Sequence, residues 1–267
     1  MRPSVPKISV VMGVYNGARY LQEAVESILA QTFSGFEFLI VDDGSLDASS
    51  ALLQGYAKRD KRVRVLRNIE NIGLTKSLNR GIKAAQGKYI ARMDADDISR
   101  PERFRKQIAF LEARPAYGLV GSWYVKINEH GRELWRGRPP LQNSALKKAL
   151  IVRNPFPHAS LMIRRHALED VGPYNESWAV SQDYELLFRI SSKYKIGVVP
   201  EFLFSSRVLS SSVTNTRNRE QILAAFYARK AAIQRGQYPK FAFLFCLLAL
   251  SSFLLPISWR LFLKRLM

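Results

Sequence analysis

Cysteine and histidine are scarce in this chain of 267 residues. The sequence contains one cysteine, Cys246, and three histidines, His130, His158 and His166. A single cysteine excludes a disulfide framework and a zinc site built from thiolates. The histidines are too scattered to indicate a histidine-rich metal cage. The first seven residues lead directly into a strand-like segment, so the sequence predicts no signal peptide. We therefore expect a folded protein of a reducing compartment.

Acidic residues are few relative to basic ones. The chain has 22 Asp and Glu against 41 Lys and Arg, which gives a formal net charge of +19. Such an excess suggests phosphate, nucleic acid or an anionic membrane as a partner. The hydrophobic fraction of 47% and the charged fraction of 24% exclude a disordered or low-complexity chain. The length allows one large domain or two small ones.

A long apolar run occurs only near the C-terminus. Residues 241–259 contain no charged side chain, although three serines and a proline interrupt them, and basic residues flank both ends. A transmembrane helix needs roughly 20 apolar residues, so this run could span a bilayer or lie in its interface. A helical hairpin packed on the rest of the chain is the alternative. Residues 201–267, with ten basic and two acidic side chains, are about twice as basic per residue as the preceding chain. Because basic flanks favour anionic lipid, we predict a domain over residues 1–215 and a basic, apolar helical tail for membrane association over residues 216–267.

Apolar strand-like runs alternate with segments of helical periodicity in the first half of the chain. Runs at 8–14, 36–41, 63–66 and 89–93 are typical of buried strands, and helices are expected between them and after Pro101. This alternation predicts right-handed βαβ units and an α/β fold with a mainly parallel central sheet and helices on both faces.

The pattern weakens after residue 115. It still predicts strands at 119–127, 134–135 and 160–163, and a helix over 184–190 for which Ser181 is the expected N-cap. Residues 205–216, rich in Ser and Thr, are expected to form a loop at the boundary of the tail.

Polar residues follow three of the predicted strands. Ligands of open parallel sheets bind beyond the carboxyl ends of the strands. The candidate binding residues at this edge are Tyr15, Asn16, Asp42, Asp43, Asp94 and Asp96.

The segment Asp94-Ala95-Asp96-Asp97 places three carboxylates within four residues. They repel one another unless a cation or solvent relieves them, and Mg²⁺ commonly uses one or two carboxylates together with substrate phosphates. A solvated loop in which Asp97 caps the next helix is the alternative; the position directly after a buried strand favours a metal site. Asp42 and Asp43 could accept hydrogen bonds from a nucleobase or ribose, or from their own turn.

Together these motifs resemble family-2 glycosyltransferases of the kind that build bacterial cell-surface polysaccharides. The similar segments lie between about residues 8 and 190, in the order and spacing of that family. They are Val14-Tyr15-Asn16 with Leu21, Ser27 and Gln31-Thr32, then Ile40-Val41-Asp42-Asp43-Gly44-Ser45, Asn71-Ile72-Gly73-Leu74, Ala91-Arg92-Met93-Asp94-Ala95-Asp96-Asp97 and Gln182-Asp183-Tyr184-Glu185-Leu186. The resemblance implies a Rossmann-like GT-A fold, a nucleotide-sugar donor, a Mg²⁺ or Mn²⁺ ion and inversion at the anomeric carbon.

The resemblance also implies roles for individual residues. Tyr15 matches the residue that stacks near the base, and Asp43 the carboxylate that reads the base edge. Asp94 and Asp96 match the acidic pair that meets the ribose and the metal on the diphosphate. Asp183 matches the general base. Without the resemblance, the alternative is a structural carboxylate that the helix dipole stabilises at the start of a helix.

Two positions depart from the family pattern, and one further match has two alternative roles. Gln182 stands where relatives often have Glu, before the base. In relatives, a Tyr-Arg-x-His segment and a later Ser close over the diphosphate. The corresponding residues here are Ser206-Arg207-Val208-Leu209 and Ser212, so Arg207 alone remains as a phosphate contact. His158 resembles a residue near the acceptor side and would meet acceptor or phosphate, unless it is a hydrogen-bonded structural histidine.

The sequence thus predicts an inverting, metal-dependent glycosyltransferase of the hexosyltransferase type. The acceptor would be a hydroxyl of a lipid-linked glycan in surface polysaccharide biosynthesis, and the enzyme would lie at the cytoplasmic face of the inner membrane. Such a transfer needs one carboxylate to take the hydroxyl proton. Transfer to a polyprenyl phosphate is the first alternative. A non-enzymatic nucleic-acid-binding protein is a distant one, because the acidic cluster would repel phosphates; we expect no nucleic acid as a partner.

Overall fold

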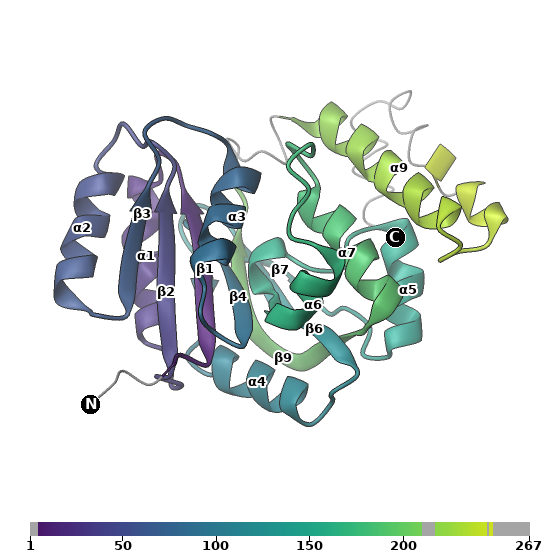
Figure 1. The fold of residues 1–267 in the computed structure, drawn as a ribbon, viewed down its shortest axis with the longest axis horizontal. Helices are drawn as coiled ribbons and strands as arrows, with labels where there is room; N and C mark the ends of the chain where they lie inside the picture. The colour runs from purple at the N-terminus through teal and green to yellow at the C-terminus, as the bar shows by residue number, and fades with distance from the viewer. Residues whose placement is uncertain (1–4, 210–216, 245, 248–267) are drawn as a thin grey trace.

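Strand β1 (Ile8–Val14) lies at the centre of four parallel strands. It pairs with β2 (Phe36–Asp42) on one side and with β4 (Tyr89–Asp94) on the other, and β3 (Val63–Arg67) pairs with β2. The connecting helices are α1 (Ala18–Leu29), α2 (Ser49–Arg59) and α3 (Leu74–Ala84). The predicted βαβ units are therefore confirmed. The computed structural model describes residues 5–209, 217–244 and 246–247 (Figure 1).

The second half of the chain extends this sheet in mixed directions. Its strands are β5 (Ile98–Ser99), β6 (Tyr117–Ile127), β7 (Glu133–Gly137), β8 (Met162–Arg164) and β9 (Lys195–Arg207). The strand order is β3-β2-β1-β4-β8-β6-β9-β5, with β7 paired to β6. The β4–β8, β6–β8, β6–β7 and β5–β9 ladders are antiparallel, and β6–β9 is parallel. The expected mainly parallel sheet is thus wrong for this half. The residues of a strand do not indicate whether it pairs parallel or antiparallel. The long connections after residue 115 allow either direction.

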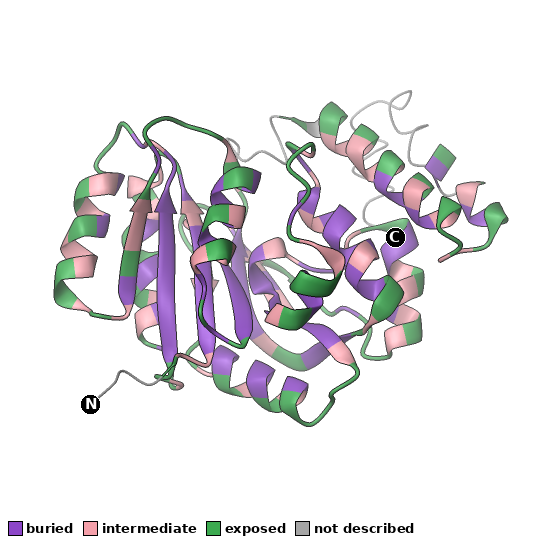
Figure 2. Ribbon diagram, viewed as in Figure 1, coloured by how far each residue is buried: buried purple, intermediate pink, exposed green. Residues whose placement is uncertain are grey.

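Two hydrophobic cores lie on opposite faces of the sheet, because successive side chains of a strand point to opposite faces. In β1, Val10 and Met12 join the core beneath α1, α2 and α4 (Arg103–Glu112), whereas Val11 joins the core beneath α3. That second core also receives α5 (Asn143–Val152), α6 (Arg165–Val171), α7 (Gln182–Lys193) and α9 (Asn218–Gln234). Figure 2 shows the buried strands between partly exposed helices, as expected for helices on both faces.

The loop predicted at 205–216 needs correction, and the predicted N-cap of α7 is refined. Residues 205–207, expected as loop, continue β9 up to Arg207, while 210–216, including Ser212 and the proposed domain boundary, lie outside the described residues. Ser181 is the N-cap residue of α7, as expected, although it has a left-handed backbone with φ of 55° and makes no capping hydrogen bond through its side chain.

The first part of the predicted tail packs on the sheet domain. Helix α9 lies against α7, and Ala228 and Ala232 are buried there. After the 3-10 turn η2 (Lys240–Ala242), residue 245 and residues 248–267 lie outside the described chain, so most of the apolar run at 241–259 does too. Among the described residues, no helix combines the length and apolar character that crossing a membrane requires.

Candidate active site

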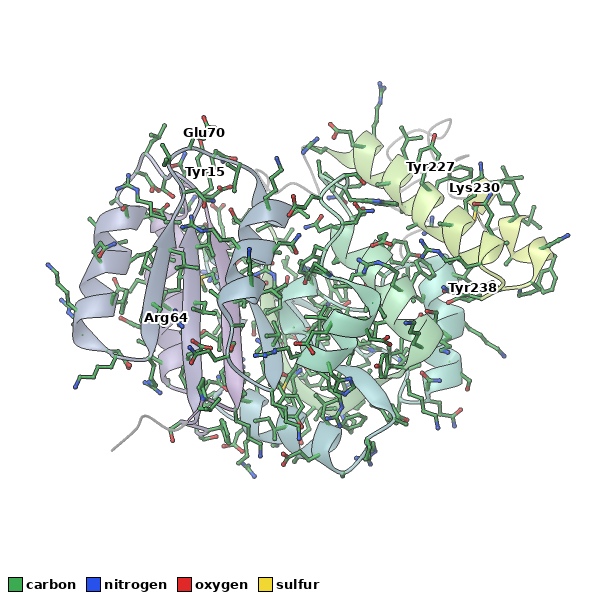
Figure 3. All side chains as sticks on the ribbon, viewed as in Figure 1. Tyr15, Arg64, Glu70, Tyr227, Lys230 and Tyr238 are labelled. Carbon is green, nitrogen blue, oxygen red and sulfur yellow. The ribbon has the colours of Figure 1, made fainter. Side chains whose placement is uncertain are left out.

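The carboxyl ends of β2, β1 and β4 lie level at one edge of the sheet. Val14 pairs with Asp42 across the β1–β2 ladder, and the preceding Gly13 pairs with Asp94 across the β1–β4 ladder. The polar residues that follow these strands therefore share an edge, as predicted. Tyr15 lies here, 47% exposed, and is labelled at the top of the sheet in Figure 3.

The loops after β1 and β2 are tied together by hydrogen bonds. The Asn16 amide donates to the Ser45 hydroxyl at 3.1 Å, and the Leu46 amide donates to Oδ1 of Asn16 at 2.8 Å. Asn16 adopts a left-handed backbone with φ of 50°, which Asn tolerates better than most residues. These bonds hold Tyr15 at the rim of the edge.

Asp43 is buried and orders the loop that precedes α3. Its Oδ1 accepts hydrogen bonds from Nδ2 of Asn68 at 2.6 Å and from the Ile72 amide at 3.0 Å, and its Oδ2 accepts one from the Gly73 amide at 2.9 Å. This carboxylate is thus bound to the loop before α3, and it lies at the sheet edge where the nucleobase of the donor was predicted to bind. A contact between Asp43 and the nucleobase stays a prediction.

The neighbouring Asp42 and Gly44 complete this turn. Asp42 is fully buried; its Oδ1 accepts from the Ser45 amide, and its Oδ2 lies 3.8 Å from Nε of Arg67. Within the described chain, Oδ2 of Asp42 has no hydrogen-bond partner. Gly44 has φ of 74°, and a Cβ there would come within 2.6 Å of the Glu70 carbonyl carbon, so the close packing of these loops requires glycine.

Asp94 ends β4 beside a buried arginine. Arg92, which is only 2% exposed, donates from Nη2 to Oδ1 of Asp94 and from Nη1 to the Val11 carbonyl at 3.3 Å. The guanidinium therefore places a positive charge beneath the acidic cluster. Sequence reasoning missed Arg92 as part of the site; its position two residues before Asp94, in an otherwise apolar strand, was the available signal.

Asp96 and Asp97 lie in an environment that disfavours their charge. Burial, followed by the negative charge of Asp94, raises the pKa of Asp96 to about 6. Burial, followed by the charges of Asp96 and Asp94, raises the pKa of Asp97 well above its ordinary value, although its Oδ1 accepts a hydrogen bond from the Arg207 amide at 2.7 Å. Asp97 thus faces inward to β9, and Asp94 and Asp96 are left as the outward carboxylates of the cluster.

Arg207 is buried in contacts with the protein. Its Nε donates to the Asp96 carbonyl at 2.9 Å, and its Nη2 donates to the Glu23 carboxylate. Its Nη1 donates to the carbonyls of Asn128 and Glu129 at 3.2 and 3.1 Å. These bonds use four of the five guanidinium N–H groups. In this structure Arg207 holds the acidic loop in place, and a diphosphate contact stays a prediction.

A divalent cation fits the acidic edge only in part. Within the residues that the structure describes, no three His, Cys, Asp or Glu side chains are grouped as metal ligands. Asp94 and Asp96 offer two hard oxygen ligands whose mutual repulsion a cation would relieve. This matches the mode in which Mg²⁺ or Mn²⁺ takes one or two carboxylates and completes its shell with substrate phosphates and water.

Asp183 lies in the first turn of α7, partly buried. Its Oδ2 accepts a 2.8 Å hydrogen bond from Nδ2 of Asn154, which follows α5. Burial raises the pKa of Asp183 to about 6, while backbone hydrogen bonds lower it and the charge of Asp94 raises it further. Asp183 and Asp94 are therefore close enough to interact electrostatically, which brings the predicted base to the predicted metal pair. No sequence pattern had indicated Asn154.

His158 lies in the turn η1 (His158–Ser160), close enough to Arg92 for the charge of that arginine to act on its ring. Its Nε2 shares a 2.6 Å hydrogen bond with the hydroxyl of Tyr174, another residue that the sequence analysis did not identify. Burial, and then the charge of Arg92, lowers the pKa of His158 well below its ordinary value, so the ring is neutral at pH 7. Of the two interpretations of His158, the structure shows a hydrogen-bonded histidine; a contact with acceptor or phosphate stays a prediction.

Several proteins named as glycosyltransferases are similar to this chain. An uncharacterized glycosyltransferase of Methanocaldococcus jannaschii is 34% identical over 229 residues, which cover 84% of this chain and 79% of the relative. The amylovoran biosynthesis glycosyltransferase AmsE of Erwinia amylovora is 32% identical over 235 residues, covering 85% and 86%. The putative glycosyltransferase EpsE of Bacillus subtilis is 37% identical over 172 residues, covering 64% and 61%.

Two solved structures share the fold at low sequence identity. TarS of S. aureus in complex with UDP-GlcNAc superposes with a TM-score of 0.68 at 19% identity, covering 83% of this chain and 66% of the TarS chain. The mannosyltransferase PcManGT of Pyrobaculum calidifontis, in complex with GDP-Man and Mn²⁺, gives a TM-score of 0.65 at 17% identity, covering 97% and 79%. That TarS chain spans residues 1–349, and a longer TarS chain is covered to only 39%.

The family assignment rests on both the site and the whole sequence. The carboxylates at the ends of β2 and β4 lie at the sheet edge where the strand pattern placed them, and Asp183 lies in the first turn of α7. The sequence model described as Glycosyl transferase family 2 matches residues 9–172, more than half of the chain. The chain belongs to glycosyl transferase family 2, and the protein is a glycosyltransferase.

Proposed function

We propose that the protein transfers a sugar, with inversion, from a nucleotide-sugar donor to a hydroxyl of a glycan acceptor in surface polysaccharide biosynthesis. The observation that carries this proposal is the placement of Asp183. It starts α7, is held by Asn154 and lies within electrostatic range of Asp94 at the ligand-binding edge of the sheet. A single poised carboxylate beside an acidic pair is what an inverting transfer to a hydroxyl requires.

Asp183 would act as the general base. With a pKa of about 6 it is mostly ionised at pH 7 yet more basic than an ordinary aspartate. As the acceptor oxygen attacks the anomeric carbon, Asp183 takes the hydroxyl proton and the bond to the nucleoside diphosphate breaks on the opposite face. The Asn154 amide fixes the carboxylate in position during this step.

The donor would lie along the edge formed by β2, β1 and β4. Tyr15 and Asp43 would contact the base and Asp94 the ribose, while Asp94 and Asp96 would hold the metal. The bound Mg²⁺ or Mn²⁺ would neutralise charge on the departing diphosphate. The UDP-GlcNAc of the TarS structure and the GDP-Man and Mn²⁺ of the PcManGT structure support a donor and a cation of these classes.

The acceptor is proposed to be a lipid-linked glycan. The similarity to AmsE, whose name assigns it to amylovoran biosynthesis, supports polysaccharide assembly. Transfer to a polyprenyl phosphate is the alternative. A phosphate oxygen is already ionised at neutral pH and needs no base, so the poised Asp183 favours a hydroxyl. Because the chain is a family-2 glycosyltransferase, the non-enzymatic nucleic-acid-binding alternative does not stand.

We also propose that the C-terminal segment attaches the enzyme to the cytoplasmic face of a membrane. Leu223, Tyr227 and Lys230 recur at helical spacing on the exposed side of α9, and Tyr227 and Lys230 are labelled there in Figure 3. Beyond it, Phe241 and Leu244 are 75% and 60% exposed. Exposed apolar side chains with interspersed cations suit an anionic lipid interface.

Flotation of the full chain with vesicles tests this attachment. We expect binding to vesicles containing anionic lipid, and weaker binding after the double change Phe241→Asp and Leu244→Asp. Leu46→Asp, at an exposed leucine after β2, is the matched control. Equal flotation of all three proteins, or none, would contradict attachment through these residues.

A donor screen tests the proposed activity itself. The full chain with Mn²⁺ is incubated with several UDP-, GDP- and dTDP-sugars and scored for release of nucleoside diphosphate; at least one donor should be turned over. The product's anomeric configuration, measured by NMR against that of the donor, should be inverted. Retention of configuration, or no turnover with any donor, would contradict the proposal.

A further inference from the structure

Strand β7 exposes large apolar side chains in a domain that buries most others. In the described sheet, β7 pairs only with β6, at the edge of the sheet. Trp135 and Leu134 on this strand are 50% and 52% exposed. Native proteins usually protect such an edge with charged side chains or cover it with another segment. The exposed tryptophan is therefore a candidate contact for a ligand.

Trp135 forms a continuous surface with two residues of β6. It lies directly opposite Lys126 in the β6–β7 ladder, and its ring centroid is 5.6 Å from that of Tyr124, with the planes 67° apart. The Tyr124 ring lies across Gly137, where a Cβ would come within 2.2 Å of the ring. Glycine at this position lets the tyrosine lie over β7. We call Tyr124, Lys126 and Trp135 the Tyr124–Trp135 surface.

This surface adjoins the acidic loop, because Ser206, the partner of Lys126, directly precedes Arg207, whose amide donates to Asp97 at 2.7 Å. Lys126, whose Nζ donates to the Ser206 hydroxyl at 2.8 Å, interacts electrostatically with Asp97, Asp94 and Asp96, although burial is the larger effect and lowers its pKa.

On the other side, burial raises the pKa of Tyr124, and the positive charge of Arg153 opposes this shift. Arg153 directly precedes Asn154, the hydrogen-bond donor to Asp183. The end of β6 also runs toward the edge of the sheet that carries Asp94, because β6 and β4 both pair antiparallel with β8.

We propose that the Tyr124–Trp135 surface is the acceptor subsite and that it binds a sugar ring of the acceptor against Trp135. The inference rests on the proposed function. A pyranose has an apolar face of C–H groups that an exposed aromatic ring covers, while its hydroxyls stay in water or reach polar neighbours. The hydroxyl that reacts would be presented to Asp183, which takes its proton as the oxygen bonds to the donor's anomeric carbon and the nucleoside diphosphate leaves.

The chemistry of the surface favours a sugar over a polyprenyl phosphate at this position. Its exposed part is aromatic, and its one cation, Lys126, is half-buried and already bonded to Ser206 and near three carboxylates. The side chain that donates to the Asp183 carboxylate is the neutral amide of Asn154, and the exposed ring of Trp135 offers a phosphate headgroup no partner.

The test measures transfer to octyl glycosides of several hexoses and to undecaprenyl phosphate, using the full chain, Mn²⁺ and the donor found by the screen. We expect transfer to at least one glycoside. Trp135→Ala should raise the KM for that glycoside about five- to tenfold, as expected for a lost aromatic contact, while the KM for the donor changes less than twofold. Trp135→Phe should recover most of the difference. Leu134→Ala is the matched control, because its side chain points to the other face of β7.

The outcomes separate this proposal from the proposed function. Transfer to undecaprenyl phosphate with no glycoside accepted would overturn the subsite. So would a glycoside KM that is unchanged in Trp135→Ala or equally raised in Leu134→Ala, or donor hydrolysis without transfer to any glycoside. Failure of the wild-type protein to turn over any nucleotide sugar would instead overturn the proposed function, on which the subsite depends.

Discussion

The amide of Asn154 donates a 2.8 Å hydrogen bond to Oδ2 of Asp183 across 29 positions of sequence. This bond joins the end of α5 to the start of α7. It stabilises the ionised carboxylate, against the burial that raises the pKa of Asp183 to about 6. Asn154 therefore acts as a positioning residue for the proposed base, and its effect should be visible in the pH dependence of transfer.

Substitution of Asn154 should shift the acidic limb of the pH profile upward. Asn154→Ala removes the donor, so the pKa of Asp183 should rise by about 0.5–1 unit. Asn154→Asp also adds a like charge and should raise it further. The measurement is kcat/KM against pH from 5 to 9. Asn175→Ala, in the loop before α7, is the control; the idea fails if both Asn154 variants keep the wild-type limb.

Asp183→Asn should abolish transfer and stabilise the fold at neutral pH. Without a base, kcat should fall by about 10²–10⁴-fold, while nucleotide binding stays nearly intact. The raised pKa of Asp183 means that its ionisation costs folding stability, a cost absent below the unfolded value of 3.8 and complete above about pH 6. The variant should therefore gain about 1–3 kcal/mol at pH 8 and little at pH 4.

Denaturant unfolding of wild type and Asp183→Asn at the two pH values measures this gain. Isothermal titration with the nucleoside diphosphate measures binding. Loss of nucleotide binding together with loss of stability would assign Asp183 a structural role in place of a catalytic one.

Replacement of Asp96 by a neutral residue should abolish metal-dependent transfer. Chelation of the wild type with EDTA should stop transfer, and Mn²⁺ should restore it, because the diphosphate leaving group needs charge neutralisation. Asp96→Asn should lower transfer by at least about 100-fold and weaken Mn²⁺ binding measured by electron paramagnetic resonance with the nucleoside diphosphate present. Asp170→Asn, at an exposed ion pair with Lys193, is the control. Transfer that persists unchanged in Asp96→Asn would refute the metal assignment.

Arg229 should couple α9 to the proposed base. This buried side chain donates from Nη2 to the Val152 carbonyl at 2.7 Å, and from Nε to the Tyr184 hydroxyl at 3.1 Å. It thus binds the segment that leads to Asn154 and the residue that follows Asp183. Arg229→Met should lower the free energy of unfolding by about 2 kcal/mol and reduce kcat more than the donor KM.

Lys230→Ala, at the exposed neighbouring position, serves as the control for Arg229, and Arg229→Lys should recover part of the loss. The pH profile distinguishes positioning from stability alone. If Arg229→Met unfolds more easily yet retains the wild-type kcat and acidic limb, α9 supports the fold and has no influence on the base.

Local patterns in the sequence accounted for the βαβ half of the molecule. The strand-like runs at 8–14 and 89–93 are β1 and β4, and the carboxylates after them lie at one edge. This worked because a βαβ unit has one preferred hand and brings neighbouring strand ends together. Gly87, by contrast, packs against β1, where a Cβ would come within 2.5 Å of the Ser9 nitrogen, and no local pattern indicates this contact.

The sequence by itself determined the βαβ half, the family and the identity of the acidic residues, because local periodicity and motif spacing carry that information. Only the tertiary structure decided the mixed direction of the second half, the partners of Asp183 and the burial of Arg207. Arg207 reaches Glu23 over 184 positions. Contacts over such separations follow no period in the sequence; they arise only when packing brings distant segments together.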